Sequence, residues 1–176
     1  MINSAKINRL LTRGVEEIVE TEHLKESLRS GKPLRVKFGI DPTSPDLHLG
    51  HMVPLRKLRQ FQDAGHIAVL IIGDYTALIG DPSGRDKTRV GLSKKQVSEN
   101  VKTYEEQLFR ILNPDKTEVR RQSEWFKNFN LEKVIELTSK VSSWHLFSHE
   151  TFSGRKAKNQ ALMHHETLYP LLQGYD

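Results

Sequence analysis

The sequence predicts an α/β fold in which helices flank a parallel β-sheet. A strand-like apolar segment at 34–40 precedes a segment at 49–63 with apolar residues at helical spacing, and a second apolar run follows at 67–72. A strand, a helix and a strand in this order form a β-α-β unit, which requires a right-handed crossover and parallel strands. Because both strands read as continuous apolar runs, we expect helices to cover both faces of the sheet.

The remaining elements follow from shorter signals. Apolar residues recur on helical faces over 5–30, which predicts a helical lead-in at 1–32. Ser93 and Gln96 have the spacing of a capping box and predict a helix over 93–112, which Pro114 ends. Residues 117–120 read as a third strand and 131–140 as another helix. With no internal repeat or long linker, 33–176 is expected to be one Rossmann-like half-domain with a helical insertion.

Composition limits the classes of function. The chain has 176 residues, a formal net charge of +5 and no cysteine, so disulfides and thiolate metal sites are excluded. No apolar run is long enough to cross a bilayer, and the first residues lack the apolar core of a signal peptide, so a cytoplasmic location is expected. The positive charge is compatible with an RNA partner, but it is also common among proteins that touch no nucleic acid.

The segment Pro45-Asp46-Leu47-His48-Leu49-Gly50-His51 carries the strongest chemical signal. It places two imidazoles around a glycine where a strand gives way to a helix. The first amides of a helix lack partners and attract anions, and His48 and His51 can donate hydrogen bonds to phosphate oxygens. Gly50 would let a ligand approach the backbone. By itself the pattern leaves a surface histidine pair or a metal site equally open.

Two further segments suggest a small zwitterionic ligand. A buried strand leads into a glycine-rich loop at 71–84, which contains Asp81. At the end of the chain, Tyr169, Gln173 and Asp176 are spaced so that they line one face of a helix. A phenol, an amide and a carboxylate on one face suit a polar zwitterion that carries a hydroxyl group.

Asp41-Pro42-Thr43 followed by His-Leu-Gly-His resembles the first signature of class I aminoacyl-tRNA synthetases, His-Ile-Gly-His, with Leu49 in place of isoleucine. The three segments together, in this order and spacing, resemble bacterial tyrosyl-tRNA synthetases. The resemblance runs from about Leu34 to Asp176 and is weakest between Val141 and Met163. It implies the class I catalytic fold, a Rossmann-like parallel sheet with flanking helices, here incomplete at its carboxyl end.

The resemblance also implies a reaction and partners. The carboxylate of L-tyrosine attacks the α-phosphate of ATP, and the tyrosyl group then passes to tRNA(Tyr). ATP is a substrate that arrives with Mg²⁺ held mostly by its phosphates, and no permanently bound cofactor is implied. A homodimer without membrane association is expected. The pair His164-His165 next to Glu166 could suggest a metal site, but adjacent helical positions diverge, and no metal site is predicted.

By the same resemblance, three residues act on the phosphates during activation: Thr43, His48 and His51. Four more would line the nucleotide: Gly39, Asp41, Gly50 and Arg89. Each has a simpler structural role, since Thr43 could be an ordinary turn hydroxyl and Gly39 could mark a strand end. Arg85 and Lys87 extend a basic run that could meet departing pyrophosphate, although Asp86 interrupts it.

Five residues correspond to the family's tyrosine-binding set: Thr76, Asp81, Tyr169, Gln173 and Asp176. Asp81 would take the ammonium group, with Thr76 beside it, and Asp176 would read the hydroxyl group. Lys37 departs from the family, because many tyrosyl enzymes have a tyrosine there that also touches the substrate hydroxyl. The aromatic residues Trp125, Phe126 and Phe129 are read as core or interface.

The family's second signature, Lys-Met-Ser-Lys-Ser, has no match in this sequence, and Ser93-Lys94-Lys95 is better explained as a helix cap. We therefore expect a fragment of a longer synthetase without its carboxyl-terminal remainder and RNA-binding domain, and inactive alone. Two other hypotheses stay open. One is a tryptophanyl-tRNA synthetase or a nucleotidylyltransferase with the same nucleotide signature; the other is a truncated, non-catalytic binding module.

Overall fold

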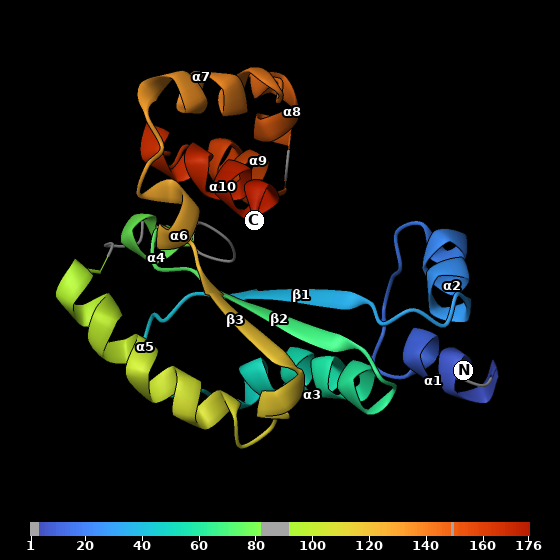
Figure 1. Cartoon of the computed structure of the whole chain (residues 1–176). Coiled ribbons are helices and arrows are strands. Elements are labelled where there is room, and N and C mark those ends of the chain that lie inside the picture. Colours follow the sequence, from blue (N-terminus) through green and yellow to red (C-terminus); the bar gives the residue numbers. More distant parts are fainter. Residues whose placement is uncertain (1–3, 82–91, 149) are drawn as a thin grey trace. The chain divides into compact units, whose positions relative to one another are not determined.

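The computed structural model describes residues 4–81, 92–148 and 150–176. It is a mixed α/β fold whose three strands form one parallel sheet in the order β1-β2-β3 (Figure 1). The strands are β1 (Arg35–Ile40), β2 (Ile67–Ile72) and β3 (Thr117–Arg121). The predicted parallel sheet with flanking helices is confirmed.

The helices have the following bounds. Before the third strand lie α1 (Ser4–Thr12), α2 (Thr21–Arg29), α3 (Leu49–Asp63), α4 (Thr76–Ile79), α5 (Lys94–Leu108) and the 3-10 turn η1 (Pro114–Lys116). After it lie α6 (Ser123–Phe126), α7 (Leu131–Ser139), α8 (Ser143–Ser148), α9 (Glu150–Ala157), the 3-10 turn η2 (His164–Thr167) and α10 (Leu168–Tyr175). None of these described helices is both long and apolar enough to cross a membrane.

Local sequence signals predicted the positions of several helices and strands correctly. The predicted helix at 49–63 and the strand at 67–72 coincide with α3 and β2. The capping box at the start of α5 is present, since the Ser93 amide donates to Gln96 Oε1 at 3.0 Å and the Gln96 amide donates to Ser93 Oγ at 3.3 Å. The helix is shorter than predicted, because it ends at Leu108.

The segment 5–30 was predicted to be helical, and it is helical only in part. It consists of α1 and α2 separated by an irregular segment. Gly14 has φ +64° and Glu20 has φ +56°, both in the left-handed region that a right-handed helix excludes. These two residues therefore interrupt the helix, although the apolar pattern of the sequence continues across the break.

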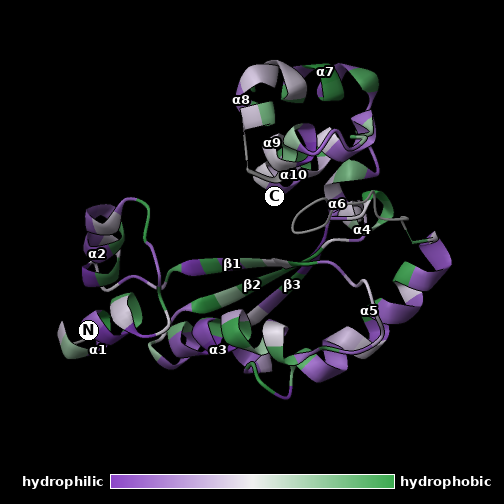
Figure 2. Cartoon of the chain, turned by 180° about the vertical axis from the view of Figure 1, so that it is seen from behind, coloured by the Kyte–Doolittle hydropathy of each residue, from purple (hydrophilic) through white to green (hydrophobic). Residues whose placement is uncertain are grey.

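Burial of the strands also differs from expectation. β2 is central in the sheet, and all its residues after Ile67 are buried, as predicted for a strand covered on both faces (Figure 2). β1 instead alternates exposed and half-buried residues, and only its last residue, Ile40, is buried. β1 lies at an edge of the described sheet, and its alternating pattern shows that one of its two faces is less covered than the other.

The chain forms two compact units. The first comprises Met1–Phe38, Ser44–Ile71 and Lys102–Arg120. Its core is built from α1, α2 and α3, where Ile7, Leu10, Leu28 and Phe61 pack together. The helical periodicity of α3 explains its share of the buried residues, because Leu55, Leu58 and Phe61 lie on one stripe.

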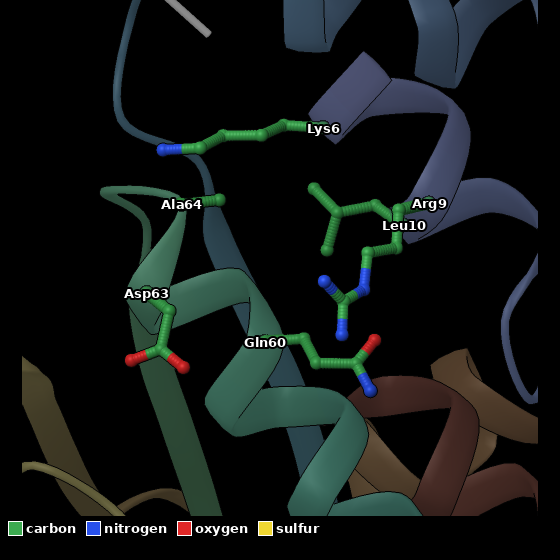
Figure 3. A pocket seen from close by; sticks show the side chains of 6 residues that line it. All are labelled: Lys6, Arg9, Leu10, Gln60, Asp63 and Ala64. Atoms are coloured by element: carbon green, nitrogen blue, oxygen red, sulfur yellow. The ribbon is translucent and has the colours of Figure 1, made fainter.

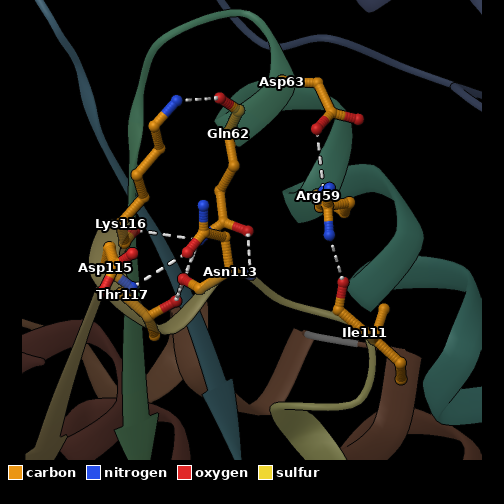
Figure 4. A network of polar contacts seen from close by, with 8 residues as sticks. All are labelled: Arg59, Gln62, Asp63, Ile111, Asn113, Asp115, Lys116 and Thr117. Atoms are coloured by element: carbon orange, nitrogen blue, oxygen red, sulfur yellow. Dashed lines mark hydrogen bonds and ion pairs between the residues drawn. The ribbon is translucent and has the colours of Figure 1, made fainter.

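A buried amide adds a polar anchor to the first unit (Figure 4). Gln62, 1% exposed on α3, accepts from the Asn113 amide at 2.9 Å through its Oε1. Its Nε2 lies 2.9 Å from the Lys116 carbonyl and 2.8 Å from Thr117 Oγ1. These contacts fix the end of α3 to the turn that starts β3.

The second unit comprises Gly39–Thr43, Ile72–Val101 and Arg121–Asp176. An aromatic cluster is part of its core. Phe126 is 4% exposed and has the rings of Tyr75, Phe129 and Tyr175 within 5.1 to 5.7 Å. The predicted core role of Phe126 is confirmed.

Candidate functional site

The two histidines of the first motif fold back onto the start of α3. His48 is the N-cap residue, and its Nδ1 accepts a hydrogen bond from the Gly50 amide at 3.1 Å. The His48 amide in turn donates to Nδ1 of His51 at 3.2 Å. The two rings stack with their centroids 3.8 Å apart. The motif is thus a reciprocal cap made from two imidazoles.

This cap changes how an anion could be bound. We expected open amides at the helix start, but the Gly50 amide is bonded to His48 Nδ1 and the His51 amide to the His48 carbonyl at 2.9 Å. Because both Nδ1 atoms act as acceptors, each neutral ring carries its proton on Nε2. The Nε2–H groups of the two imidazoles are therefore the donors that the histidine side chains offer to a phosphate oxygen.

The His51 ring is only partly exposed. Burial, and secondarily the neighbouring His48, lowers the pKa of His51 below its usual value. At neutral pH His51 is therefore an uncharged hydrogen-bond donor. The edge of Tyr104 lies beside it, with ring centroids 6.1 Å apart, and limits its movement.

The structure gives a steric reason for glycine at position 50 that the sequence did not reveal. A Cβ atom at this position would lie 2.9 Å from His48 Cε1 and 3.0 Å from His48 Nδ1. A side chain here would therefore push the His48 ring out of its capping position. The glycine makes room for the histidine of its own motif.

The turn before the motif is held by α5. Thr103 Oγ1 donates to the Pro45 carbonyl at 2.6 Å, and Gln107 Nε2 donates to the same carbonyl at 3.0 Å. Gln107 Oε1 accepts from the Leu47 amide at 2.9 Å. Sequence reasoning missed both residues, since they belong to a distant helix and carry no motif.

In the second unit Asp41 joins residues from two other segments of the chain. Thr76 Oγ1 donates to Asp41 Oδ1 at 2.7 Å, and the hydroxyl of Tyr169 donates to Asp41 Oδ2 at 2.9 Å. Sequence reasoning assigned Asp41 to the nucleotide, and in the structure its carboxylate contacts two residues assigned to tyrosine. The carboxylate orders both hydroxyl groups at once.

Gly73 allows this arrangement. A Cβ atom at Gly73 would lie 1.9 Å from Asp41 Oδ1 and 2.4 Å from Thr76 Oγ1. No side chain fits in that space. Gly73 is a residue that sequence reasoning missed, although its position directly after β2 was visible.

Gln122 is a further residue that sequence reasoning missed. It is 2% exposed, and its Oε1 accepts from the amides of Tyr75 at 3.2 Å and Thr76 at 2.9 Å. Its Nε2 donates to Asp176 Oδ2 at 2.8 Å. Gln122 therefore caps the start of α4 and orients the carboxylate that follows α10.

The other predicted residues lie as follows. Tyr169 is half-buried on α10, whereas Gln173 is exposed, and Asp176 follows the last helical residue, Tyr175. Asp81 is half-buried and lies two residues after the end of α4.

On the nucleotide side, Thr43 is half-buried with its amide bonded to the Asp41 carbonyl at 2.8 Å. Gly39 and Lys37 are exposed on β1. Arg89 and the neighbouring basic run lie outside the described residues.

The His164-His165-Glu166 segment holds a buried ion pair. Glu166, 1% exposed, accepts from Arg155 Nη1 at 2.8 Å, and its other oxygen accepts from the Met163 amide at 2.9 Å. The Glu166 carboxylate therefore has a structural role. In the described part of the chain no group of three or more His, Cys, Asp or Glu residues could hold a metal ion.

Comparison with known proteins places these arrangements in a family. The family model of class I tRNA synthetases (W and Y) matches residues 29–176. A tyrosine–tRNA ligase of Dehalococcoides mccartyi is 54% identical over 171 residues, which are 97% of this chain and 43% of that protein. The chain thus spans less than half the length of this relative.

Solved structures share the fold. The C-terminally truncated mitochondrial tyrosyl-tRNA synthetase of Aspergillus nidulans superposes with a TM-score of 0.83 at 21% identity, over 99% of this chain and 53% of that chain. The tyrosyl-tRNA synthetase of Archaeoglobus fulgidus complexed with L-tyrosine gives 0.76 at 22% identity, over 98% and 51%. With its family model, its sequence relatives and its fold in agreement, the chain belongs to the class I tRNA synthetases of the tryptophan and tyrosine group.

Proposed function

We propose that this chain is the amino-terminal part of the catalytic domain of a tyrosine–tRNA ligase, which activates L-tyrosine with ATP and transfers it to tRNA(Tyr). The name of the 54% identical relative supports the amino acid. The single observation that carries the proposal is the hydrogen-bonded chain Tyr169–Asp41–Thr76 together with Gln122–Asp176. It prearranges the polar groups that a tyrosine ligand needs, so little side-chain ordering remains on binding.

On the tyrosine side, Asp176 would accept the hydrogen bond of the substrate hydroxyl. Gln122 orients this carboxylate and keeps it next to a buried amide. Phenylalanine, which has no hydroxyl group, would leave the acceptor without its partner, and such a loss discriminates strongly. Thr76 and Asp81 would receive the ammonium group, and Tyr169 and Gln173 would line the same ligand.

On the nucleotide side, the Nε2–H groups of His48 and His51 would donate to ATP phosphate oxygens. Thr43, Gly39, Asp41, Gly50 and Arg89 complete the proposed nucleotide set. A carboxylate oxygen of tyrosine bonds to the α-phosphorus, the bond from that phosphorus to the bridging oxygen breaks, and pyrophosphate leaves with the electron pair. The substrate is its own nucleophile, so the protein contributes positioning and stabilisation of developing charge.

Transfer completes the cycle. A ribose hydroxyl of tRNA attacks the tyrosyl carbonyl carbon, and AMP leaves. Mg²⁺ would arrive with ATP and be held mostly by phosphates, since it retains water and phosphate ligands readily. The proposed location is the cytoplasm.

Exposed apolar side chains in the second unit support the proposed homodimer. Trp144 is 83% exposed, and Leu131, Ile135 and Met163 are exposed apolar residues of the same unit. Large apolar side chains in water favour association with another protein surface. Trp144→Ser should shift the sedimenting species of the full-length protein from dimer to monomer, and an unchanged dimer would remove Trp144 from the proposed interface.

Tyrosine-dependent exchange of pyrophosphate into ATP by the full-length protein tests the function. We expect exchange with tyrosine and little with tryptophan or phenylalanine; exchange driven by tryptophan would instead select the tryptophanyl alternative. His48→Ala or His51→Ala should slow adenylate formation by an amount equivalent to roughly 2–4 kcal/mol while the Kd for tyrosine stays nearly unchanged. Equal losses in tyrosine affinity and rate would contradict the assigned role.

The 176-residue chain alone is expected to show no aminoacylation, because no Lys-Met-Ser-Lys-Ser segment is present in it. The same exchange assay compares it with the full-length protein. Robust exchange by the chain alone would show that the remaining half is not needed for activation.

A further inference from the structure

A groove between α1 and α3 in the first unit is not explained by the tyrosine or ATP chemistry. It consists of two adjoining cavities of about 490 and 250 Å³ that share Arg9, Gln60 and Asp63. Figure 3 shows the smaller one, with Arg9 of α1 extending its guanidinium group toward Gln60 of α3. We call this feature the α1–α3 groove.

Six cationic side chains line the α1–α3 groove and one carboxylate accompanies them. The cations come from both helices and the residue after α1: Lys6, Arg9, Arg13, Arg56, Lys57 and Arg59. The carboxylate is Asp63, which pairs with Arg59 at 2.8 Å. Six cations and one carboxylate give the lining of the groove a formal net charge of +5.

Two of the cations make the groove rigid. Lys57 donates to the carbonyls of Leu10 and Arg13, which fixes the end of α1 against α3. Burial lowers the pKa of Lys57, as expected for an ammonium group enclosed between two helices. Arg59 Nη1 donates to the Ile111 carbonyl at 3.0 Å, so its guanidinium group is also held in place (Figure 4).

The other three arginines are available to a ligand. Over residues 4–81, 92–148 and 150–176, no ion pair engages the side chains of Arg9, Arg13 or Arg56, and all three are exposed. Uncompensated cations gathered in a concave surface raise the local concentration of anions. Repulsion among them would be relieved by a ligand that carries several negative charges.

The composition of the groove favours a nucleic acid over a protein. Four of the six cations are arginines, whose planar guanidinium forks match phosphate oxygens in pairs. Protein interfaces depend on buried aromatic and aliphatic anchors. The lining of the two cavities contains no aromatic residue, and its apolar members are isolated aliphatic side chains such as Leu10 and Val53.

We propose that the α1–α3 groove binds the phosphate backbone of an RNA, outside the site for tyrosine and ATP. Arg9, Arg13 and Arg56 contact phosphates, while Lys57 and Arg59 hold the two helices at the spacing these contacts need. The choice of RNA as the nucleic acid rests on the proposed function, since that function uses tRNA. Recognition through phosphates alone is independent of base sequence.

The test compares matched charge removals in the full-length protein. Arg9→Gln/Arg13→Gln/Arg56→Gln empties the groove of its available cations, and Lys102→Gln/Lys127→Gln/Lys133→Gln removes the same charge from exposed positions elsewhere. Binding of a fluorescent tRNA(Tyr) transcript and of an unrelated RNA hairpin is measured between 50 and 200 mM salt. Poly-glutamate serves as an acidic polypeptide probe.

The groove variant should bind both RNAs about 10-fold or more weakly at 150 mM salt, with its salt slope reduced by roughly one for each arginine. The control variant should change little. Arg9→Lys/Arg13→Lys/Arg56→Lys should keep the slope, because it keeps the charge. Equal losses in the groove and control variants, a reduced slope in the lysine variant, or an effect confined to poly-glutamate would each overturn the proposal.

Tyrosine-dependent pyrophosphate exchange separates this inference from the proposed function. Activation requires no RNA, so the groove variant should exchange at the wild-type rate. Loss of exchange together with loss of RNA binding would indicate a folding defect and overturn the assignment of the groove. Absence of exchange in the wild-type protein would refute the proposed function while the RNA measurement still stands.

Discussion

Replacing Gln122 with leucine should disturb α4 and Asp176 together, because one buried amide serves both. The Oε1 of Gln122 accepts from two backbone amides at 3.2 and 2.9 Å, and its Nε2 donates to Asp176 Oδ2 at 2.8 Å. Thr76 Oγ1 also lies 3.0 Å from Oε1, but its single proton is better donated to the Asp41 carboxylate at 2.7 Å. Three hydrogen bonds therefore depend on Gln122.

The expected magnitude follows from this count. Each buried partner left without a hydrogen bond costs about 1–3 kcal/mol, and water that enters the site recovers part of this. The leucine side chain preserves most of the volume, so no large cavity term is added. Gln122→Leu should therefore lower the free energy of local opening around α4 by about 3–5 kcal/mol.

Hydrogen exchange of the Tyr75 and Thr76 amides measures this opening directly. At about 1.4 kcal/mol for each factor of ten, their exchange in full-length Gln122→Leu should accelerate at least 100-fold, while amides in α3 are unaffected. Gln122→Glu is the matched variant, because it keeps the acceptor but places a carboxylate against Asp176. Its tyrosine binding should recover toward low pH, where the two carboxyl groups share a proton. Protection of both amides within a factor of five of wild type in Gln122→Leu would refute the reasoning.

Two further perturbations test the packing of each unit. Gly73→Ala should destabilise the protein by more than about 3 kcal/mol, because its Cβ would overlap Asp41 Oδ1. Gly174→Ala is the control: it lies in α10 and its Cβ meets no atom within 4 Å, so it should be slightly stabilising. Similar thermal midpoints for the two variants would contradict this. Burial lowers the pKa of His66 below its usual value of 6.5 in the folded protein. As the pH falls below 6.5, the unfolded chain therefore takes up a proton at His66 more readily than the folded protein does. The contribution of His66 to the free energy of unfolding is thus present above pH 6.5 and is lost as the pH falls. His66→Gln should therefore lose less unfolding free energy than wild type between pH 7.5 and 5.5, and an equal loss would remove His66 as the cause.

The sequence by itself determined the elements whose signals are local. The bounds of α3 and β2, the cap of α5 and the order of strand, helix and strand all depend on residues within a few positions of one another. The motif histidines were identified for the same reason, since their types and spacing lie within seven consecutive residues. The break between α1 and α2 was missed because two backbone conformations, at Gly14 and Glu20, override a continuing apolar pattern.

Only the tertiary structure decided which distant groups meet. Asp41 and Tyr169 are 128 residues apart, and Gln122 and Asp176 are 54 apart, so no short-range pattern links them. Gly73 is indispensable only because the Asp41 carboxylate packs against its backbone. The stacked imidazoles at α3 depend on side-chain orientation, which spacing does not specify. Periodicity and capping depend on residues that are close together in the sequence. The hydrogen-bond partners of a buried polar group, by contrast, are set by how distant segments pack against one another.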